Sequence, residues 1–330
     1  MLPPTFEDIV AAREFISPYL PNTPLVRVAK LSEELGCDYY VKLENLQPTG
    51  AFKVRGGVNL VGNEVSTASD RVTLVSASTG NHGQSIAYAS RLFGARVIIY
   101  APTENVNEAK MQAMRDLGAE VRLQGRDFDE ARLECERVAR AEGFRYVHSA
   151  NEPKLIAGVG AIGLEIFEDL PDVDVIIAPA GGGSCASGNC IVANKLNPRV
   201  RVIAAQSEAA PAMWHAWRNR TLDPYPTMET VHEGLATRVP FELTNKILWE
   251  LLDDFVLVTD EEINEAIRLL ARDAKQVAEG AGAASLAAAI KLRDRLRGKK
   301  VVGVLTGGNT PLERLRKLMT RAAEALTSDR

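Results

Sequence analysis

The sequence predicts an α/β protein with two open, twisted parallel-sheet domains, the smaller inserted in the larger. Short apolar runs alternate with amphipathic stretches from about residue 72 onward, which is typical of parallel strands joined by crossover helices. A second series of the same kind begins near residue 155. The 330 residues suffice for about two domains of roughly 150 residues each.

The first series predicts a compact unit with four strands. Two of its helices are followed by Gly118 and Gly143, and glycine commonly ends a helix. We assign residues 67–150 to this smaller, mobile domain. The expected strands are 71–76, 96–100, 119–123 and 144–148, and the expected helices are 81–93, 106–118 and 127–143.

The second series predicts the larger domain, formed by residues 1–66 together with 151–330. The run DYYVKLE at 38–44 precedes the first series and is expected to join this second sheet. Open parallel sheets bind ligands at the C-terminal ends of their strands, so we expect the ligand between the two domains. The other expected strands are 173–179, 200–206, 255–260 and 301–309, and the expected helices are 155–169, 190–196, two alanine-rich helices separated at EGAGAA (279–284), and a basic last helix.

Composition excludes several classes of protein. The net charge is −4, from 39 Lys and Arg against 43 Asp and Glu, and the charges are scattered, which leaves no footprint for nucleic acid or an anionic membrane. No stretch reaches the roughly 18 apolar residues of a membrane span, and the N-terminus lacks a signal-peptide pattern. We expect a cytoplasmic protein that acts on a small molecule.

Cysteine and histidine are scarce. The four cysteines include no C-x-x-C pair and are expected to be reduced thiols. The four histidines show no H-x-H or H-x-x-x-H spacing. These patterns disfavour a metal site and Ser-His-Asp chemistry.

The loop QPTGAFKVRGG at 47–57 places Lys53 at the expected first turn of a helix. A lysine with an ordinary pKa of about 10.4 is almost entirely protonated at pH 7, so a nucleophilic lysine needs a lowered pKa. The positive end of a helix and partial burial both lower the pKa of a lysine. Taken alone, a lysine here is more often a solvated residue at a helix start.

The loop SASTGNHGQS at 76–85 leads from a strand end into a helix. Ser78, Thr79 and Asn81 offer polar side chains, while the backbone N–H groups around Gly80 and His82 lack helical acceptors, which suits a bound carboxylate. A helix N-cap with a tight turn explains the same residues without any ligand.

The loop APAGGGSCASGN at 178–189 contains three consecutive glycines before a helix. Glycines allow close approach of the backbone to an anion, and the helix N-terminus supplies donors, so phosphate is the expected occupant. Gly181, Gly183 and Ala186 also fit a loose G-x-G-x-x-A pattern, which keeps a nicotinamide-dependent dehydrogenase open. A dehydrogenase of this kind needs an acidic residue at the end of the next strand to bind the ribose of the dinucleotide. That strand ends at Gln206, and the nearest acid is Glu208.

The loop LTGGNTP at 305–311 places Thr306 at the C-terminal end of the last apolar strand. Its hydroxyl is suited to a hydrogen bond with a ring nitrogen, and a plain strand-to-helix turn is the simpler interpretation of this loop alone.

Together and in this order, the four loops resemble the fold-type II pyridoxal phosphate enzymes, in the serine/threonine dehydratase and serine racemase branch. The resemblance extends from NTPLV at 22–26 to the last helix. It implies a tryptophan synthase beta-like fold, pyridoxal 5'-phosphate as cofactor and a homodimer.

The resemblance also implies roles for individual residues. Lys53 is the catalytic residue and binds the cofactor aldehyde covalently, and Ser184 stands where many relatives have a fourth glycine. The residues expected to bind the cofactor are Lys53, Phe52, Asn81, Gly181, Gly182, Gly183, Ser184, Cys185, Gly234, Glu279 and Thr306, and those expected to bind the substrate are Ser78, Thr79, Gly80, Asn81 and His82.

The resemblance and the residue types point to elimination chemistry. The neutral hydroxyl of Thr306 should leave the pyridine nitrogen largely unprotonated, which disfavours long-lived carbanions. We expect a catabolic-type dehydratase that converts L-threonine or L-serine to 2-oxobutanoate or pyruvate plus ammonia. Because the two expected domains account for all 330 residues, we expect no C-terminal regulatory domain of the kind that biosynthetic threonine dehydratases carry.

Several alternatives stay open. They are a dehydratase of phenylserine or 3-hydroxyaspartate, an amino-acid racemase, and a non-catalytic amino-acid-binding relative. Serine racemases resemble this chain but carry Ser where it has Thr79, which disfavours racemisation as the main activity. Relatives that bind a divalent cation carry an acid at the position of Gln206, so a metal site is not expected here. Met213, Trp214 and Trp217 are candidates to line a side-chain pocket, although apolar residues are more often core.

Overall fold

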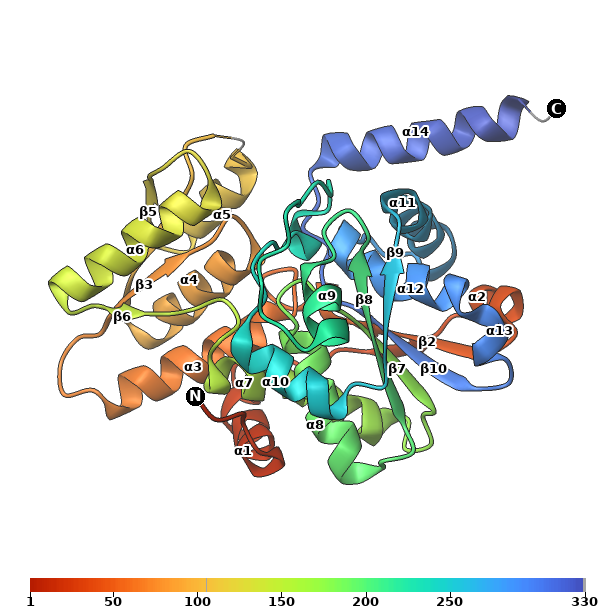
Figure 1. Cartoon of the computed structure of the whole chain (residues 1–330), viewed down its shortest axis with the longest axis horizontal. Helices are drawn as coiled ribbons and strands as arrows, with labels where there is room; N and C mark the ends of the chain where they lie inside the picture. The colour runs from red at the N-terminus through yellow and green to blue at the C-terminus, as the bar shows by residue number, and fades with distance from the viewer. Residues whose placement is uncertain (105, 329–330) are drawn as a thin grey trace.

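Two mainly parallel sheets organise the chain (Figure 1), which the computed structural model describes over residues 1–104 and 106–328, with side chains except at 129 and 321–328. The larger sheet has the order β1-β2-β10-β7-β8-β9, in which β1 pairs antiparallel with β2 and the other neighbours pair in parallel. The smaller sheet has the order β5-β4-β3-β6. The strands are β1 (Leu25–Arg27), β2 (Asp38–Leu43), β3 (Thr73–Ala77), β4 (Arg96–Ala101), β5 (Glu120–Leu123), β6 (Arg145–Tyr146), β7 (Val175–Pro179), β8 (Arg201–Ser207), β9 (Asp254–Val258) and β10 (Lys300–Leu305).

Helices cover both faces of the larger sheet because its inner strands are apolar on both sides. In β7, Ile176 and Ala178 join one buried cluster, and Val175 and Ile177 join another. The helices on the first face are α1 (Phe6–Ile16), α7 (Pro153–Asp169), α8 (Ser184–Leu196), α9 (Ala212–Asn219) and α10 (Glu242–Leu251), and those on the second are α2 (Ala29–Leu35), α11 (Asp260–Leu269), α12 (Gly280–Lys291), α13 (Arg293–Leu296) and the start of α14 (Leu312–Ser328).

The smaller sheet lies between β2 and β7 in the sequence. Val75 and Ala77 of β3 pack against α6 (Phe128–Glu142), while Leu74 faces α4 (Asn81–Phe93) and α5 (Glu108–Asp116). The predicted α/β fold class with parallel sheets is therefore confirmed, as is the expectation that the DYYVKLE segment joins the larger sheet, because β2 pairs with β10.

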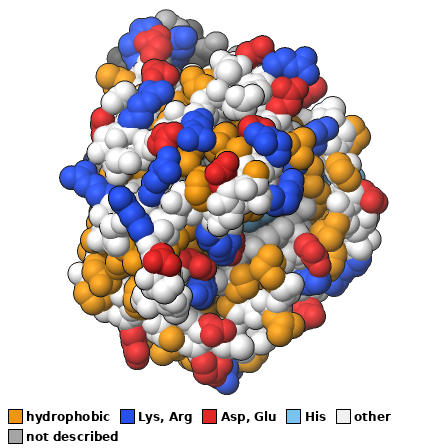
Figure 2. Space-filling model, turned by 90° about the vertical axis from the view of Figure 1, so that its left-hand side faces the viewer, with side chains coloured by type: hydrophobic (Ala, Val, Ile, Leu, Met, Phe, Trp, Pro, Cys, Tyr) orange, Lys and Arg blue, Asp and Glu red, His pale blue; other side chains and the backbone are white. Residues whose placement is uncertain are grey.

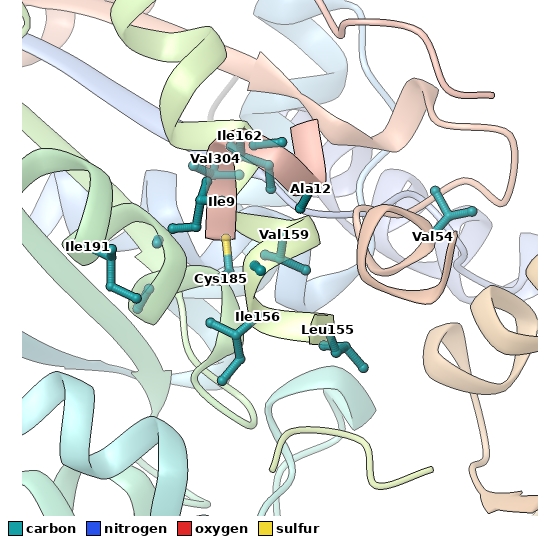
Figure 3. Packing of buried hydrophobic residues seen from close by; sticks show 14 of the residues in the cluster. Ile9, Ala12, Val54, Leu155, Ile156, Val159, Ile162, Cys185, Ile191 and Val304 are labelled. Atoms are coloured by element: carbon teal, nitrogen blue, oxygen red, sulfur yellow. The ribbon is translucent and has the colours of Figure 1, made fainter. Parts of the chain in front are cut away.

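Helix α3 (Lys53–Thr67) connects the two sheet units. Gly56 and Gly57 allow it to lie close to both neighbours, since a Cβ at Gly57 would collide with Ser85 of α4 and one at Gly56 with Leu155 of α7. Val54 belongs to the same buried cluster as Leu155 (Figure 3), and this cluster continues into the smaller unit, where it includes Leu74. The N-terminus of α3 is thus held on two sides.

Two helix boundaries differ from the prediction. Helix α8 begins at Ser184, six residues before the predicted start at 190, because Gly183 adopts φ +83° and the helix follows directly. The two alanine-rich helices are predicted to separate at EGAGAA (279–284), but the chain leaves the first helix earlier, at Lys275, which has φ +58°. Helix α12 then begins at Gly280, inside the EGAGAA segment.

A buried network of charged side chains lies beneath the start of α3. The Arg55 guanidinium donates to both oxygens of Glu44 and both oxygens of Glu165, at 2.7–2.8 Å. The Lys42 ammonium lies 2.8 Å from Glu165, and these four side chains are at most 1% exposed. Although burial alone raises the pKa of the Glu165 carboxyl, its ion pairs with Arg55 and Lys42 hold that pKa below its usual range.

On the face seen in Figure 2, side chains of both charge signs are interspersed, without a continuous basic surface.

All four cysteines, at 37, 135, 185 and 190, are free and buried. Within residues 1–104 and 106–328, no helix has the length and apolarity needed to cross a membrane. The described side chains also include no group of three or more His, Cys, Asp or Glu arranged to hold a metal ion.

Candidate active site

Lys53 lies where three loops, far apart in the sequence, meet. Its Nζ is 3.3 Å from the Ser149 carbonyl oxygen and 3.1 Å from the Ser184 hydroxyl. Phe52 is the N-cap of α3, and its backbone N–H donates to the Thr306 carbonyl oxygen at 2.9 Å. The structure therefore brings the Lys53 loop, the triple-glycine loop and the Thr306 loop together.

The surroundings of Lys53 raise the fraction of its amine that is uncharged. Burial lowers the pKa of Lys53 to about 8. Burial also lowers the pKa of His82 to about 3 and that of His148 to about 4, so both imidazoles are neutral at pH 7. His148 Nδ1 accepts hydrogen bonds from two backbone N–H groups, which assigns its proton to Nε2.

The start of α4 forms a cradle of backbone donors. The Ser78 hydroxyl accepts from the N–H groups of Gly80 and Gly83, at 3.1 and 2.9 Å, and this fixes the loop. Gly80 is the N-cap and supplies no side-chain acceptor. The N–H groups of Asn81 and His82 therefore lack helical acceptors, while that of Gly83 donates to Ser78. A carboxylate fits these donors. Thr79, between Ser78 and Gly80, is partly exposed.

Asn81 is oriented by two side chains from the larger sheet unit. Its Nδ2 donates to Glu279 at 2.5 Å, and its Oδ1 accepts from Asn309 Nδ2 at 2.8 Å. The same Asn309 Nδ2 donates to the Thr49 carbonyl oxygen, next to the Lys53 loop. Burial raises the pKa of the Glu279 carboxyl.

The triple-glycine loop is held by the segment that contains Gly234. A Cβ at Gly181 would collide with the Gly234 carbonyl oxygen, and the Thr237 hydroxyl donates to the Gly181 carbonyl oxygen at 2.9 Å. Gly183 caps α8 without a side-chain hydrogen bond, so the first N–H groups of α8 lack helical acceptors. These donors beside Lys53 fit a ligand with a phosphate at one end and an aldehyde near the amine.

Cys185 contributes to the site through its backbone. Its thiol points into the apolar cluster beside Val159 and Ile156 (Figure 3), and burial raises its pKa. The side chain is therefore part of the core, while its N–H belongs to the first turn of α8.

Three parts of the site were missed in the sequence. Ser149 accepts from Lys53, Asn309 orients Asn81, and the ring of Phe241 lies against Gly182 and 5.2 Å from His148. The segment after 144–148 follows the end of a parallel strand, which is the signal that points to Ser149. Phe241 is in a loop without a motif, so no sequence signal marks it.

The three residues proposed to line a side-chain pocket lie in different surroundings. Met213 lies close to Gly183, and its sulfur contacts Asn245 Nδ2 at 3.4 Å. The indole N–H groups of Trp214 and Trp217 instead donate to the carbonyl oxygens of Phe255 and Leu248. Only Met213 of the three therefore approaches the glycine loop in the contacts described.

We expect Lys53→Met to stabilise the cofactor-free protein by about 1–3 kcal/mol at pH 7. Because burial lowers the pKa of Lys53 to about 8, the folded state binds fewer protons than the unfolded state between this pH and about 10.5. The destabilisation by Lys53 is thus complete below pH 8 and disappears as the pH rises through that window. Urea unfolding at pH 7 and at pH 10 measures the difference in the free energy of unfolding between Lys53→Met and the unchanged protein.

The control for this prediction is Lys154→Met, because Lys154 is exposed on α7. It should leave the free energy of unfolding unchanged within about 0.5 kcal/mol. A gain from Lys53→Met that is equally large at pH 10 would contradict the assignment to the buried ammonium.

The chain is similar to known proteins over nearly its whole length. The family model described as pyridoxal-phosphate dependent enzyme matches residues 16–307. The L-threonine ammonia-lyase of Thermotoga maritima is 39% identical over 321 residues, which are 96% of this chain and 78% of that protein. The catabolic L-threonine dehydratase of Staphylococcus aureus is 36% identical over 312 residues, 93% of this chain and 90% of that protein. The crystal structure of serine racemase from Dictyostelium discoideum matches with a TM-score of 0.85 and 31% identity, over 94% of this chain and 99% of that one.

Proposed function

The chain belongs to the pyridoxal-phosphate dependent enzyme family, and from this premise we propose that it is an ammonia-lyase of small 3-hydroxy amino acids. The substrates are L-threonine and L-serine, and the products are 2-oxobutanoate or pyruvate plus ammonia. The observation that carries the proposal is the Lys53 amine with its lowered pKa, held beside the starts of α4 and α8, whose N-cap residues are the glycines Gly80 and Gly183. The two ammonia-lyase relatives, at 39% and 36% identity, support the choice of substrate.

Named residues would hold the cofactor. Lys53 would bind its aldehyde, the first N–H groups of α8 and the loop from Gly181 to Ser184 its phosphate, and Thr306 its pyridine nitrogen. When bound, pyridoxal phosphate supplies a sink for the electrons of the Cα–H bond. Gly234 and Glu279 complete the enclosure, because Gly234 contacts the glycine loop and Glu279 orients Asn81.

The chain's own groups then act on the substrate. The first N–H groups of α4 bind its carboxylate, and Lys53 takes the Cα proton. With a pKa of about 8, about one Lys53 amine in ten is neutral at pH 7, against about one in a few thousand for an ordinary lysine. Loss of the 3-hydroxyl as water, followed by hydrolysis, releases the 2-oxo acid and ammonium.

Phe241 supports a substrate with a small side chain. Its ring fills the space beside Gly182 and meets the His148 ring edge-on, with the ring centres 5.2 Å apart. His148 immediately precedes Ser149, whose carbonyl oxygen contacts Lys53. An aromatic side chain on the substrate would compete with Phe241 for this side of the site.

We further propose that residues 67–150 move relative to residues 1–66 and 151–330 as the site closes. One contact that would form and break is the ion pair between Lys110 of α5 and Glu233, at 2.6 Å. We also propose a cytoplasmic homodimer. The four buried free thiols support a reducing compartment, and analytical ultracentrifugation tests the dimer.

A substrate panel tests the proposed function. We expect L-threonine and L-serine to release 2-oxo acid with a kcat/KM at least about tenfold above phenylserine and 3-hydroxyaspartate, because Phe241 restricts the space. The assay measures both 2-oxo acid and the D-isomer. Formation of D-serine without 2-oxo acid would replace the lyase by a racemase, the second candidate, which the likeness to serine racemase favours.

A further inference from the structure

The Ser184 hydroxyl lies at the junction of two parts of the site. It belongs to the first residue of α8, is 2% exposed, and lies 3.1 Å from Lys53 Nζ. A serine at a helix start commonly caps backbone N–H groups. Here Gly183 is the N-cap and gives no side-chain hydrogen bond, while the Ser184 hydroxyl contacts the lysine amine.

The amine has two acceptors at similar distances. The Ser149 carbonyl oxygen, at 3.3 Å, can only accept a hydrogen bond. The Ser184 hydroxyl can accept from the amine while its own proton is donated elsewhere. The first N–H groups of α8 make this end of the site suited to an anion, and an anion accepts that proton.

A neutral amine carries two hydrogens and one lone pair. If both hydrogens are donated, one to Ser149 and one to Ser184, the lone pair must point away from both acceptors. The direction of the basic lone pair is then set by two groups on different elements, the loop after β6 and the start of α8. With Ser149 alone, the amine can rotate about its last carbon–nitrogen bond.

We propose that Ser184 is a positioning residue, whose hydroxyl holds the free Lys53 amine with its lone pair directed toward the Cα proton of the substrate. This role rests on the proposed lyase function. It adds to the expected role of the Ser184 loop in phosphate binding, because the hydroxyl donates to the anion and accepts from the amine at the same time. No bond is made or broken at Ser184.

The test compares Ser184→Ala with Ser184→Thr, which keeps a hydroxyl. The matched control is Ser187→Ala, because Ser187 lies in the same helix, is fully buried, and donates to the Thr244 carbonyl oxygen instead. In the holoenzyme with saturating cofactor, Ser184→Ala should lower kcat about tenfold with KM unchanged. The isotope effect with Cα-deuterated threonine should rise, because proton abstraction becomes slower.

A second measurement does not depend on turnover. In cofactor-free protein, the pH midpoint for acylation of Lys53, followed by mass spectrometry, should fall by about half a unit to one unit in Ser184→Ala. The reason is that an acceptor stabilises the ammonium form, so its loss favours the neutral amine. Ser184→Thr should restore the midpoint and kcat, and Ser187→Ala should leave both unchanged.

Two outcomes would overturn the proposal. One is weaker cofactor binding in Ser184→Ala with normal kcat at saturation and an unchanged acylation midpoint, which would assign the hydroxyl to phosphate alone. The other is that Ser184→Thr behaves like Ser184→Ala. If the wild-type protein binds no pyridoxal phosphate and releases no 2-oxo acid, the proposed function fails, while the acylation midpoint still tests the contact between Ser184 and Lys53.

Discussion

Lys53→Ala is expected to abolish 2-oxo acid release from L-threonine. Removing a general base costs about 10²- to 10⁴-fold in rate, and Lys53 is also the residue proposed to bind the cofactor aldehyde. The purified variant should therefore lose both the near-visible absorbance of the lysine-bound cofactor and its activity. Absorbance spectra and the 2-oxo acid assay measure the two losses in one preparation.

Two controls make this result specific. Far-UV circular dichroism should be unchanged, because the substitution removes only the amine contacts to Ser149 and Ser184, while the backbone carbonyl at position 53 still accepts from the Ser85 hydroxyl. Lys110→Ala removes a lysine that pairs with Glu233 and should retain the absorbance. A Lys53→Ala protein with undiminished turnover would refute the proposed chemistry.

Arg55→Leu is expected to destabilise the protein by about 3–5 kcal/mol. It would leave Glu44, at 0% exposed, without its paired cation, while Glu165, at 1% exposed, would keep Lys42 at 2.8 Å and Arg13 at 3.7 Å. Burying an unpaired carboxylate is costly because water no longer solvates it. Equilibrium urea unfolding of the two proteins measures the difference.

The comparison for this prediction is Arg126→Leu. Arg126 pairs with Glu130 on the surface, where the arginine side chain is 78% exposed and water screens the pair, so the loss of stability should be far smaller. Equal effects of Arg55→Leu and Arg126→Leu on the free energy of unfolding would show that the buried network contributes no more than a surface ion pair.

The sheet architecture could be predicted because it follows from local patterns. Strands such as β7, apolar on both faces, alternate with helices followed by glycine such as Gly143, and both signals are contained in short windows. The grouping of the Lys53, Ser184 and Thr306 loops came from the resemblance of the four ordered motifs to the fold-type II pyridoxal phosphate enzymes, because each loop alone was a weak signal. The contacts of Phe52 with Thr306 and of Lys53 with Ser184 agree with it.

The remaining features depend on tertiary contacts that no local window contains. The buried partners of Arg55 come from η1 (Glu44–Leu46) and α7, more than 100 residues apart in the sequence. Phe241 reaches the site only because the start of α10 lies against the glycine loop. The early start of α8 depends on the positive φ of Gly183, which its neighbours Met213 and Thr244 surround.

The three tryptophans of the chain make it possible to follow the larger sheet unit by spectroscopy. Trp214, Trp217 and Trp249 donate their indole N–H groups to backbone carbonyl oxygens of β9, α10 and α9, respectively, all in the larger sheet unit. The smaller unit contains tyrosines, including Tyr100 and Tyr146, and no tryptophan. Tryptophan emission therefore reports on one part of the molecule alone, and an opening of the smaller unit would be silent in it.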